Sequence, residues 1–404
     1  MGVPGWDWDG WVGPELARLK DQHLFRQRRV VRPIDAVHVE IDGRRYVNFA
    51  SNNYLGLSHH PRVLRAAEDA LREFGAGSAA SPLITGYGPA HASAERALAA
   101  WKGTEAAVLL PSGYQANLAA VQTIAEVAER AGTGVRFILD KLVHASLVDA
   151  IRQSRVEFRI VQHGGGEKLS RLVFAADTKQ TQVVVTESIF SMDGDAADLQ
   201  ALAELKAKRA FILLLDEAHG SGVYGPAGSG LAAERGLAGL ADVTVVTLSK
   251  AMGGGGGALC GTRTFCDAVV NLGSAYIYST SVPPAEAAAA VAAIDVMRDE
   301  PHRQRRVREL ARLVRTELEL TAAGVTLPAG DSPILPIVLG SERAAVEAAK
   351  LLQDQGLWTL PIRPPTVPRG TSRLRVTLSC EHTDAEVGQL VAALNRLATA
   401  LPVS

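Results

Sequence analysis

Five apolar segments, each followed by a polar or glycine-rich turn and then by a helical pattern, restrict most strongly what this chain can fold into. Uninterrupted apolar runs of this length are typical of strands that are buried on both faces. Strands that alternate with helices favour a mainly parallel sheet with helices on both sides. The chain is therefore predicted to be an α/β protein. The predicted strands are Ala106–Leu110, Val135–Leu139, Gln182–Thr186, Phe211–Leu215 and Val243–Thr247.

The pattern changes after a long helical stretch that runs from Pro283 to Leu320 and is rich first in alanine and then in arginine. Beyond it the sequence predicts a smaller α+β unit, with strands Ile334–Leu339 and Leu374–Ser379 and helices Arg343–Gln355 and Asp384–Leu401. At the other end, a helical pattern over Pro14–Val31 precedes a hairpin over Val37–Ala50 that turns at Asp42-Gly43. We place a boundary near Asp299 and predict three parts: an N-terminal helix and hairpin segment (1–50), a large domain (51–298) and a small α+β domain (299–404).

Composition and charge argue against several classes of protein. The chain of 404 residues has 42 basic and 43 acidic side chains and a formal net charge of −1, which does not favour binding to nucleic acid or to an anionic membrane. Its three cysteines, Cys260, Cys266 and Cys380, show neither metal-ligand spacing nor a disulfide pattern, so we predict no metal site and a reducing compartment. The first residues lack the pattern of a signal peptide, and no apolar run approaches the roughly 20 residues of a membrane span. We therefore expect a soluble, cytoplasmic protein.

The segment from Asp242 to Gly261 contains the strongest candidate for a reactive group. A buried strand leads into Thr247-Leu248-Ser249-Lys250, and five glycines follow at Gly253–Gly257. Hydroxyls on one side of Lys250 and a turn without side chains on the other suit an amine that forms Schiff bases with a bulky cofactor. A solvated loop lysine beside a flexible turn is the alternative, and the segment alone favours that alternative.

Other polar residues lie where predicted strands end, which is where parallel sheets bind ligands. Asp216 follows a buried strand and could keep the nitrogen of a heterocycle protonated, or could cap the next turn. His144 could stack on a planar cofactor, although a lone histidine is more often structural. Ser112-Gly113-Tyr114 begins a helix after a strand and offers N–H groups to a phosphate. Together these residues supply an amine, a partner for a ring nitrogen, a stacking group and an anion site.

The motifs around these residues resemble the α-oxoamine synthases, a family of fold-type I enzymes that depend on pyridoxal 5'-phosphate (PLP). Asp216–Gly222 followed by Thr247–Lys250 carries the resemblance, which extends from about Arg26 to Leu401. The branch of the family that serves biotin biosynthesis is the most similar, on the motifs SNNYLGLSHHP, TGYGPAH, HASL, ESIFSMDGD, IYSTSVPPA and IRPPTVPRGTSRLRVTLS. The resemblance implies a large domain with a mainly parallel seven-stranded sheet and a smaller C-terminal α+β domain.

The resemblance also implies a role for each residue that matches a family motif. Lys250 would bind the cofactor covalently and carry protons, Asp216 would pair with the pyridine nitrogen, and His144 would stack on the ring and face the substrate. Ser191 and His219 would hold the ring oxygen, and Lys250, His144, Asp216 and His219 would form the catalytic set. The phosphate would be held by Ser112, Gly113, Tyr114, Thr247 and Ser249, and by Thr280 of the partner subunit. The substrate-binding residues would be Asn52 and Arg375 for the amino-acid carboxylate, and Arg26 and Thr366 for the acyl group, with Arg363 as a further candidate.

The reaction implied by the resemblance is a decarboxylative condensation of L-alanine with a pimeloyl thioester, carried by CoA or by a carrier protein, in a homodimer with shared active sites. An alternative is a related α-oxoamine synthase with another amino acid or acyl donor, similar to 2-amino-3-ketobutyrate CoA ligase. A non-catalytic relative would lack the lysine or the acid, and both are present.

Two segments depart from the usual family pattern. Gly77–Pro82 has less glycine and no basic residue near its proline, and Gly253–Gly257 has more glycine than usual. The first departure concerns the choice of acyl chain or thioester, and neither concerns the cofactor chemistry.

Overall fold

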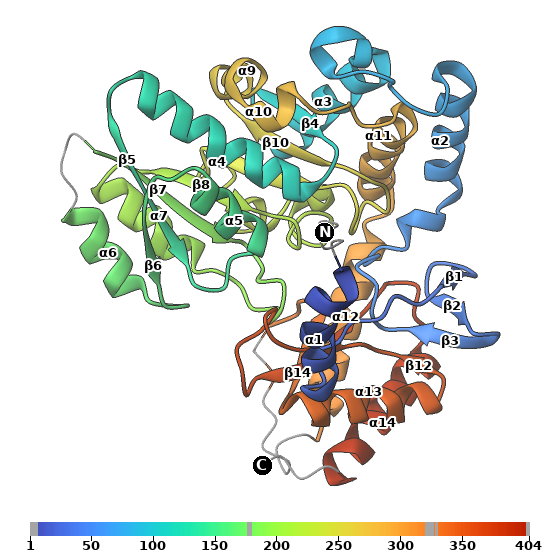
Figure 1. Cartoon of the computed structure of the whole chain (residues 1–404). Coiled ribbons are helices and arrows are strands. Elements are labelled where there is room, and N and C mark those ends of the chain that lie inside the picture. The colour runs from blue at the N-terminus through green and yellow to red at the C-terminus, as the bar shows by residue number, and fades with distance from the viewer. Residues whose placement is uncertain (1–6, 176–179, 320–326, 328–329, 401–404) are drawn as a thin grey trace, which may run out of the picture.

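A seven-stranded sheet forms the centre of the larger part of the molecule (Figure 1). The computed structural model describes residues 7–175, 180–319, 327 and 330–400. Six strands of the sheet run parallel, and only β10 is antiparallel to its neighbours β4 and β9. In spatial order the strands are β4 (Ala106–Leu110), β10 (Gly257–Gly261), β9 (Val243–Thr247), β8 (Ile212–Asp216), β7 (Gln180–Glu187), β5 (Gly134–Asp140) and β6 (Glu157–Val161).

The predicted α/β class, the mainly parallel sheet and its seven strands are confirmed. The five strands predicted one by one are β4, β5, β7, β8 and β9. The two strands that were not predicted have atypical sequences: β6 alternates charged and apolar residues at the sheet edge, and β10 begins and ends with glycine. At Gly257 a Cβ would lie 2.6 Å from the backbone nitrogen of Gly113, so a side chain at this position would collide with the start of the helix that begins at Gly113.

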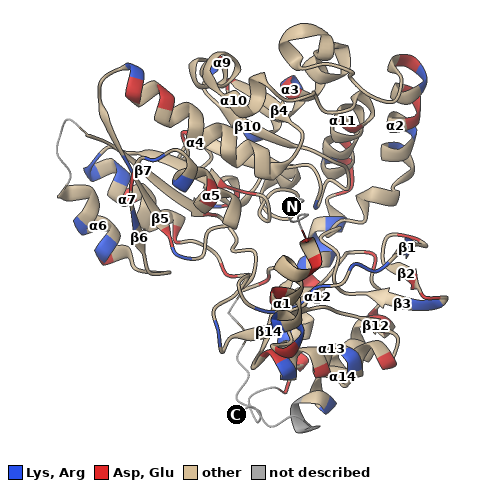
Figure 2. Ribbon diagram, in the orientation of Figure 1, with Lys and Arg blue, Asp and Glu red and all other residues tan. Residues whose placement is uncertain are grey.

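Helices cover both faces of the sheet, and alternate residues of one strand pack against the two layers. On β7, Val183 and Val185 belong to one core cluster and Val184 to the other. The first cluster contains residues of α4 (Gly113–Arg130), α5 (Ala145–Gln153), α9 (Arg263–Leu272) and α10 (Ser274–Ile277). The second contains residues of α2 (Pro61–Phe74), α3 (Pro89–Lys102), α6 (Gly166–Phe174), α7 (Leu199–Lys208), α8 (Leu231–Glu234) and α11 (Pro284–Asp299). Figure 2 shows acidic and basic residues interspersed along the outer helices.

The smaller part of the molecule combines both ends of the chain (Figure 1). Its C-terminal elements are α12 (His302–Glu317), β11 (Ile334–Gly340), α13 (Glu342–Asp354), β12 (Leu357–Trp358), β13 (Pro361–Ile362), β14 (Ser372–Thr377) and α14 (Asp384–Ala400). The N-terminal elements are α1 (Trp8–Asp21), β1 (Arg32–Pro33), β2 (His38–Ile41) and β3 (Arg44–Asn48). The predicted hairpin is confirmed as β2–β3, and β3 pairs in parallel with β12. The boundaries at 50/51 and 298/299 remain predictions.

One predicted helix has wrong bounds. The first helix covers Trp8–Asp21 instead of Pro14–Val31, because the backbone leaves the helix at His23, which has a φ of +55°. The helical stretch predicted from Pro283 is divided into two helices, α11 and α12, because Pro301 has no N–H to continue the first one. The predicted ends Leu320 and Leu401 lie outside the described residues. Within the described ranges, no helix is long and apolar enough to cross a membrane.

A buried ion pair fastens the segment that follows β8 to helix α3. Lys102 Nζ lies 2.8 Å from Glu217 Oε2, and both side chains are almost fully buried, with exposed fractions of 2% and 3%. The ammonium also donates to Ser221 Oγ at 2.7 Å and to the carbonyl of Ser229 at 2.6 Å. Asp216 immediately precedes Glu217, so this pair anchors the chain beside a predicted site residue.

We predict that Lys102→Met lowers the apparent free energy of unfolding by about 3–5 kcal/mol, because it leaves the Glu217 charge buried without a partner. Urea denaturation of the cofactor-free protein measures the change. Lys206→Met is the matched control, since the Lys206–Asp242 pair is partly exposed and its loss should cost about 1 kcal/mol or less. Equal effects of the two substitutions would contradict the assigned importance of the buried pair.

Candidate active site

The carboxyl ends of adjacent parallel strands bring the predicted polar residues to one edge of the sheet. Glu187 is the last residue of β7 and Asp216 the last residue of β8, and the two are register partners. Lys250 follows β9, and His144 follows β5. Electrostatic interactions join Lys250 to Asp216 and to Glu187, and join His144 to both Asp216 and Lys250. The four side chains therefore form one group.

Burial lowers the pKa of Lys250 below its ordinary value, and the nearby Arg375 acts in the same direction. The attraction of Asp216 and Glu187 opposes this shift without cancelling it. A lower pKa leaves more of the amine neutral near pH 7, and a neutral amine is the form that attacks a carbonyl or takes a proton.

Two hydrogen bonds hold Asp216 at the end of its strand. Its Oδ2 accepts from Asn117 Nδ2 at 2.8 Å, and its Oδ1 accepts from the backbone N–H of Ala218 at 2.9 Å. Burial and the adjacent Asp216 raise the pKa of Glu187 well above its ordinary value. Two buried carboxyl groups at neighbouring strand ends disfavour each other's charged form, so Glu187 holds its proton more tightly than an exposed glutamate does.

Hydrogen bonds set the tautomer of His144. Its Nδ1 lies 2.8 Å from Ser146 Oγ and accepts from the backbone N–H of Ser146 at 3.2 Å. Ser146 Oγ accepts in turn from Asn117 Nδ2 at 2.9 Å, so its own proton points to the imidazole and the ring carries its proton on Nε2. Burial also lowers the pKa of His144. The residue is nevertheless solvent-exposed, so an imidazole that is neutral has a face available for stacking.

A second chain of contacts links His219 to the predicted carboxylate site. Tyr54 OH lies 2.7 Å from His219 Nδ1 and 3.2 Å from Asn52 Oδ1. Arg375 Nη1 donates to Asn52 Oδ1 at 3.0 Å, and its Nε donates to the carbonyl of Ser191 at 2.6 Å. Burial, with Lys250 and Arg375 nearby, depresses the pKa of His219 well below its ordinary value, so this histidine is neutral.

The start of α4 faces the hydroxyls that precede Lys250. A Cβ at Gly113 would lie 3.1 Å from Thr247 Oγ1, and Thr247 Oγ1 lies 3.0 Å from Ser249 Oγ. Ser112 caps the helix by accepting from the N–H of Gln115 at 3.1 Å. The N–H groups of the first turn thus lie beside two hydroxyls, a set of donors suited to an anion. Tyr114 is partly exposed, and its hydroxyl donates to Asp149 Oδ2 at 2.8 Å.

Four predicted residues lie apart from this group. Arg26 and Thr366, which are distant in sequence, contact each other at 3.5 Å, and their predicted contact with the acyl group stays a prediction. Arg363 donates to the carbonyl of His23, and its pKa is lowered by burial and by Arg26. Thr280 is exposed after α10, and within the described ranges no hydrogen bond connects it to the Lys250 group.

Sequence reasoning missed three residues of the site. Asn117 binds both Asp216 and Ser146, and the only sequence signal is an asparagine among the alanines of α4, which also carries two glutamines. Glu187 ends its strand as Asp216 does, so the rule that polar strand ends form the site could have identified it. Tyr54 belongs to the SNNYLG motif, but its position gives no indication of its contact with His219.

A large cavity, about 990 Å³, lies away from this group, among residues of β5, β6 and β7 and of helices α6 and α7. Its wall includes His163, whose pKa is raised to about 10 by hydrogen bonds to Asp140 and Asp195. No residue of the Lys250 group lines it, so the chemistry assembled at the strand ends does not belong to this cavity.

The chain matches the model of the family "Aminotransferase class I and II" over residues 44–394. It is 42% identical to an 8-amino-7-oxononanoate synthase of Anaeromyxobacter dehalogenans over 97% of this chain and 96% of that protein. Identity to the synthase of the same name from Burkholderia thailandensis is 39%, over 94% and 95% of the two chains. Among solved structures, a serine palmitoyltransferase of S. paucimobilis with bound PLP superposes with a TM-score of 0.90 at 28% identity, over 99% of this chain and all of that one.

The environment of Lys250 leads to a prediction for the cofactor-free protein. Labelling of Lys250 by acetic anhydride should rise with pH and level off below the ordinary lysine pKa of 10.5, because its folded-state pKa is lowered. Peptide mass spectrometry follows the labelling rate against pH, and exposed Lys350 on α13 is the internal reference. The two lysines are compared by the pH at which their labelling rates level off. Their absolute rates are not compared, since burial slows access of the reagent to Lys250. An identical pH profile for both lysines would contradict the prediction.

Proposed function

Because the chain belongs to the class I and II aminotransferase family and is similar over nearly its whole length to 8-amino-7-oxononanoate synthases, we propose that it condenses L-alanine with a pimeloyl thioester. The products are 8-amino-7-oxononanoate, CO₂ and the free thiol of CoA or of a carrier protein. The observation that carries the proposal is the electrostatic interaction of the largely desolvated Lys250 amine with the buried carboxyl group of Asp216.

The residues present fit PLP. A buried carboxylate that accepts two hydrogen bonds suits a protonated pyridine nitrogen, and the exposed, neutral imidazole of His144 suits the face of the ring. The helix start at Gly113 with the hydroxyls of Thr247 and Ser249 suits a phosphate. When bound, PLP supplies an electron sink for negative charge at the amino-acid α-carbon.

Each residue that matches a family motif has a proposed task toward this cofactor. Lys250 binds it covalently, Asp216 holds the ring nitrogen, and Ser191 and His219 hold the ring oxygen. His219 is neutral and donates one hydrogen bond without adding a positive charge. The phosphate is held by Ser112, Gly113, Tyr114, Thr247 and Ser249 and, across a proposed homodimer interface, by the exposed Thr280 of the partner subunit.

Proton transfer at the α-carbon of alanine is the proposed task of Lys250 once its amine is free. The lowered pKa suits this task, because the amine is then neutral at a lower pH than an exposed lysine would be. Arg375 and Asn52 hold the carboxylate of the amino acid, a group that the planar guanidinium matches with two donors. Arg375 Nη1 donates to Asn52 Oδ1, so the two side chains lie next to each other.

The acyl donor is proposed to contact Arg26 and Thr366. These side chains meet at 3.5 Å although 340 residues separate them in sequence. Arg363 lies close enough for Arg26 to lower its pKa, so two guanidinium groups are available to an anionic part of the donor.

Assembly and location are also proposals. A homodimer rests on the family resemblance and on the placement of Thr280 outside the site of its own chain. A cytoplasmic location is consistent with three free cysteines at positions 260, 266 and 380, which suit a reducing compartment.

The direct test is mass spectrometry of the product formed from L-alanine and pimeloyl-CoA. We predict that Lys250→Ala lowers the turnover rate by at least about 10²–10⁴-fold, because a positioned proton-transfer group is lost. The variant should also lose the cofactor absorbance that depends on a covalent lysine. Lys350→Ala on the outer helix α13 is the control and should behave as wild type. Full activity of Lys250→Ala, or product from glycine or serine but not from alanine, would overturn the assignment.

For the acyl site, we predict that Arg26→Met raises the KM for the pimeloyl donor about ten-fold or more, because a charge-assisted contact is lost. The KM for L-alanine should stay within about two-fold, since Arg375 and Asn52 hold that substrate. Arg28→Met, at an exposed neighbouring position, is the matched control. A rise in both KM values, or in neither, would show that Arg26 has another role.

A further inference from the structure

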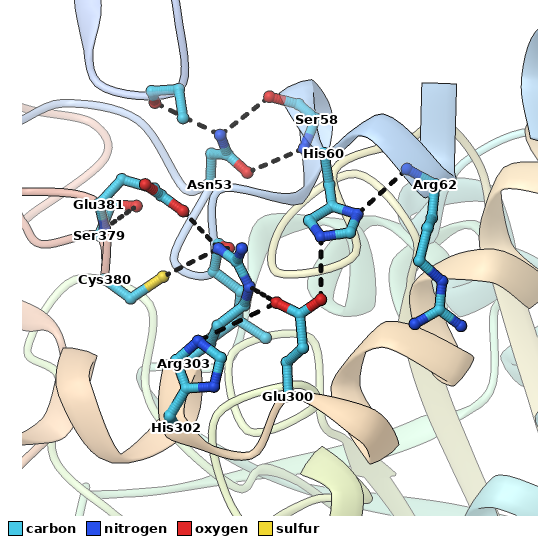
Figure 3. A network of polar contacts seen from close by, with 12 residues as sticks. Asn53, Ser58, His60, Arg62, Glu300, His302, Arg303, Ser379, Cys380 and Glu381 are labelled. Carbon is cyan, nitrogen blue, oxygen red and sulfur yellow. Dashed lines mark hydrogen bonds and ion pairs between the residues drawn. The ribbon is translucent and has the colours of Figure 1, made fainter. Parts of the chain in front are cut away.

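A network of polar contacts surrounds the break between α11 and α12, outside the residues to which a role has been given (Figure 3). It brings together three segments that are distant in sequence: the loop 52–60, the helix junction 300–303 and the segment 379–381 after β14. Asn52 lies in the first segment, and the last follows the strand that carries Arg375. The network therefore touches both elements that present the proposed carboxylate-binding pair.

Arg303 is the centre of this network. Its Nε donates to Glu300 Oε2 at 2.7 Å, and its Nη1 donates to the carbonyl of Leu55 at 3.2 Å and to Glu381 Oε1. Nη1 also lies 3.8 Å from Cys380 Sγ. The side chain is only 15% exposed, so these charge-assisted hydrogen bonds are largely protected from water. One planar guanidinium thus holds all three segments.

The loop that carries Asn52 is fastened to the helix junction at two points. Leu55 accepts from Arg303, and His60 Nε2 lies 3.2 Å from Glu300 Oε1. Within the loop, Asn53 Nδ2 donates to Ser58 Oγ at 2.8 Å and Asn53 Oδ1 accepts from the N–H of Ser58 at 3.3 Å. The loop is therefore closed on itself between its two attachments.

The strand that carries Arg375 is attached to the same loop. The N–H of Thr377 donates to the carbonyl of Phe49 at 2.8 Å, and the N–H of Cys380 donates to the carbonyl of Tyr54 at 2.8 Å. Glu381, the next residue, binds Arg303. The distance between Asn52 and Arg375 thus depends on backbone contacts between loop and strand, and the Arg303 guanidinium joins both sides next to those contacts.

We propose that Arg303 is a positioning residue for the substrate carboxylate: by binding Leu55 and Glu381 at once, it fixes the spacing of Asn52 and Arg375. The proposal rests on the proposed function in one respect: the carboxylate of an amino acid must bind Asn52 and Arg375. Arg303 has no contact with the pair itself and acts through the two segments. A site whose two anchors are held at the right spacing pays less ordering entropy when the ligand binds.

The experiment compares Arg303→Met with Arg306→Met in PLP-loaded protein. Arg306 lies three residues further along α12 and binds Asp384 Oδ1 at 2.6 Å and the carbonyl of His382 at 3.4 Å, so it also joins α12 to the chain after β14. It makes no contact with the loop 52–60, within the described residues. The measured quantity is the Kd of L-alanine, taken from the absorbance change of the bound cofactor. L-alaninol, which has no carboxylate, is the reference ligand.

We expect Arg303→Met to raise the Kd of L-alanine about ten-fold or more and to leave the Kd of L-alaninol within about two-fold of wild type. Arg306→Met should leave both values within about two-fold. Arg303→Lys keeps the charge but loses the planar fork, so it should weaken alanine binding by an intermediate factor. If Arg303→Met does not fold, Arg303→Lys carries the test.

Two results would overturn the proposal: an alanine Kd close to wild type in the Arg303 variants, or equal weakening of alanine and alaninol. The second result would indicate a general structural role. If wild type responds to glycine or serine and not to alanine, the proposed reaction is wrong, and the same comparison is made with the amino acid that binds and its amino alcohol. The two proposals therefore fail separately.

Discussion

The site depends on the placement of a single negative charge, that of Asp216, at a buried strand end. Parallel strands set Glu187 directly beside it, and burial disfavours two charges there, so the pKa of Glu187 is raised well above its ordinary value. The remaining carboxylate is held by Asn117 and Ala218 and lies close to the Lys250 amine. Much of the surrounding structure keeps this charge in place: Lys102 anchors the next residue, and Asn117 connects the carboxylate to the loop of His144 through Ser146.

Neutral groups complete the electrostatic design. His144 and His219 both have lowered pKa values, because each is desolvated to some degree and lies near Lys250, and both therefore act as neutral imidazoles. The cations that remain, Lys250 and Arg375, have opposite tasks in the proposed reaction: the first must lose its proton easily and the second must keep its charge. A partly desolvated amine and a guanidinium are suited to those tasks, since only the amine can shift its pKa far enough.

The sequence predicted the sheet, and it singled out Lys250, Asp216 and the helix start at Gly113, because each of these follows from local pattern: an apolar run, a polar residue beyond its end, a turn between a strand and a helix. Asn117 and Glu187 could have been found only from the contact between elements, and Arg303 looks like any other arginine of a basic helix until Leu55 and Glu381 lie beside it. Strand β10 was missed since its glycines reflect close packing, of Gly257 against the start of α4 and of Gly261 against Asp242, which no local propensity describes. One helix bound failed at His23, and the helical stretch from Pro283 is divided at Pro301, because single residues redirect the backbone at both places.

The parallel pair of β3 with β12 has a consequence for how the chain is made. Leu357 pairs with Val47, and Trp358 with Asn48, so the N-terminal sheet lacks its fourth strand until more than 300 further residues have been joined. At synthesis rates of about 5–20 residues per second, about 15–60 s pass between the synthesis of the β2–β3 hairpin and that of its partner strand β12. The large sheet, whose strands lie between residues 106 and 261, emerges first. Residues 357 and 358 therefore complete the N-terminal sheet only after all strands of the large sheet have been synthesised.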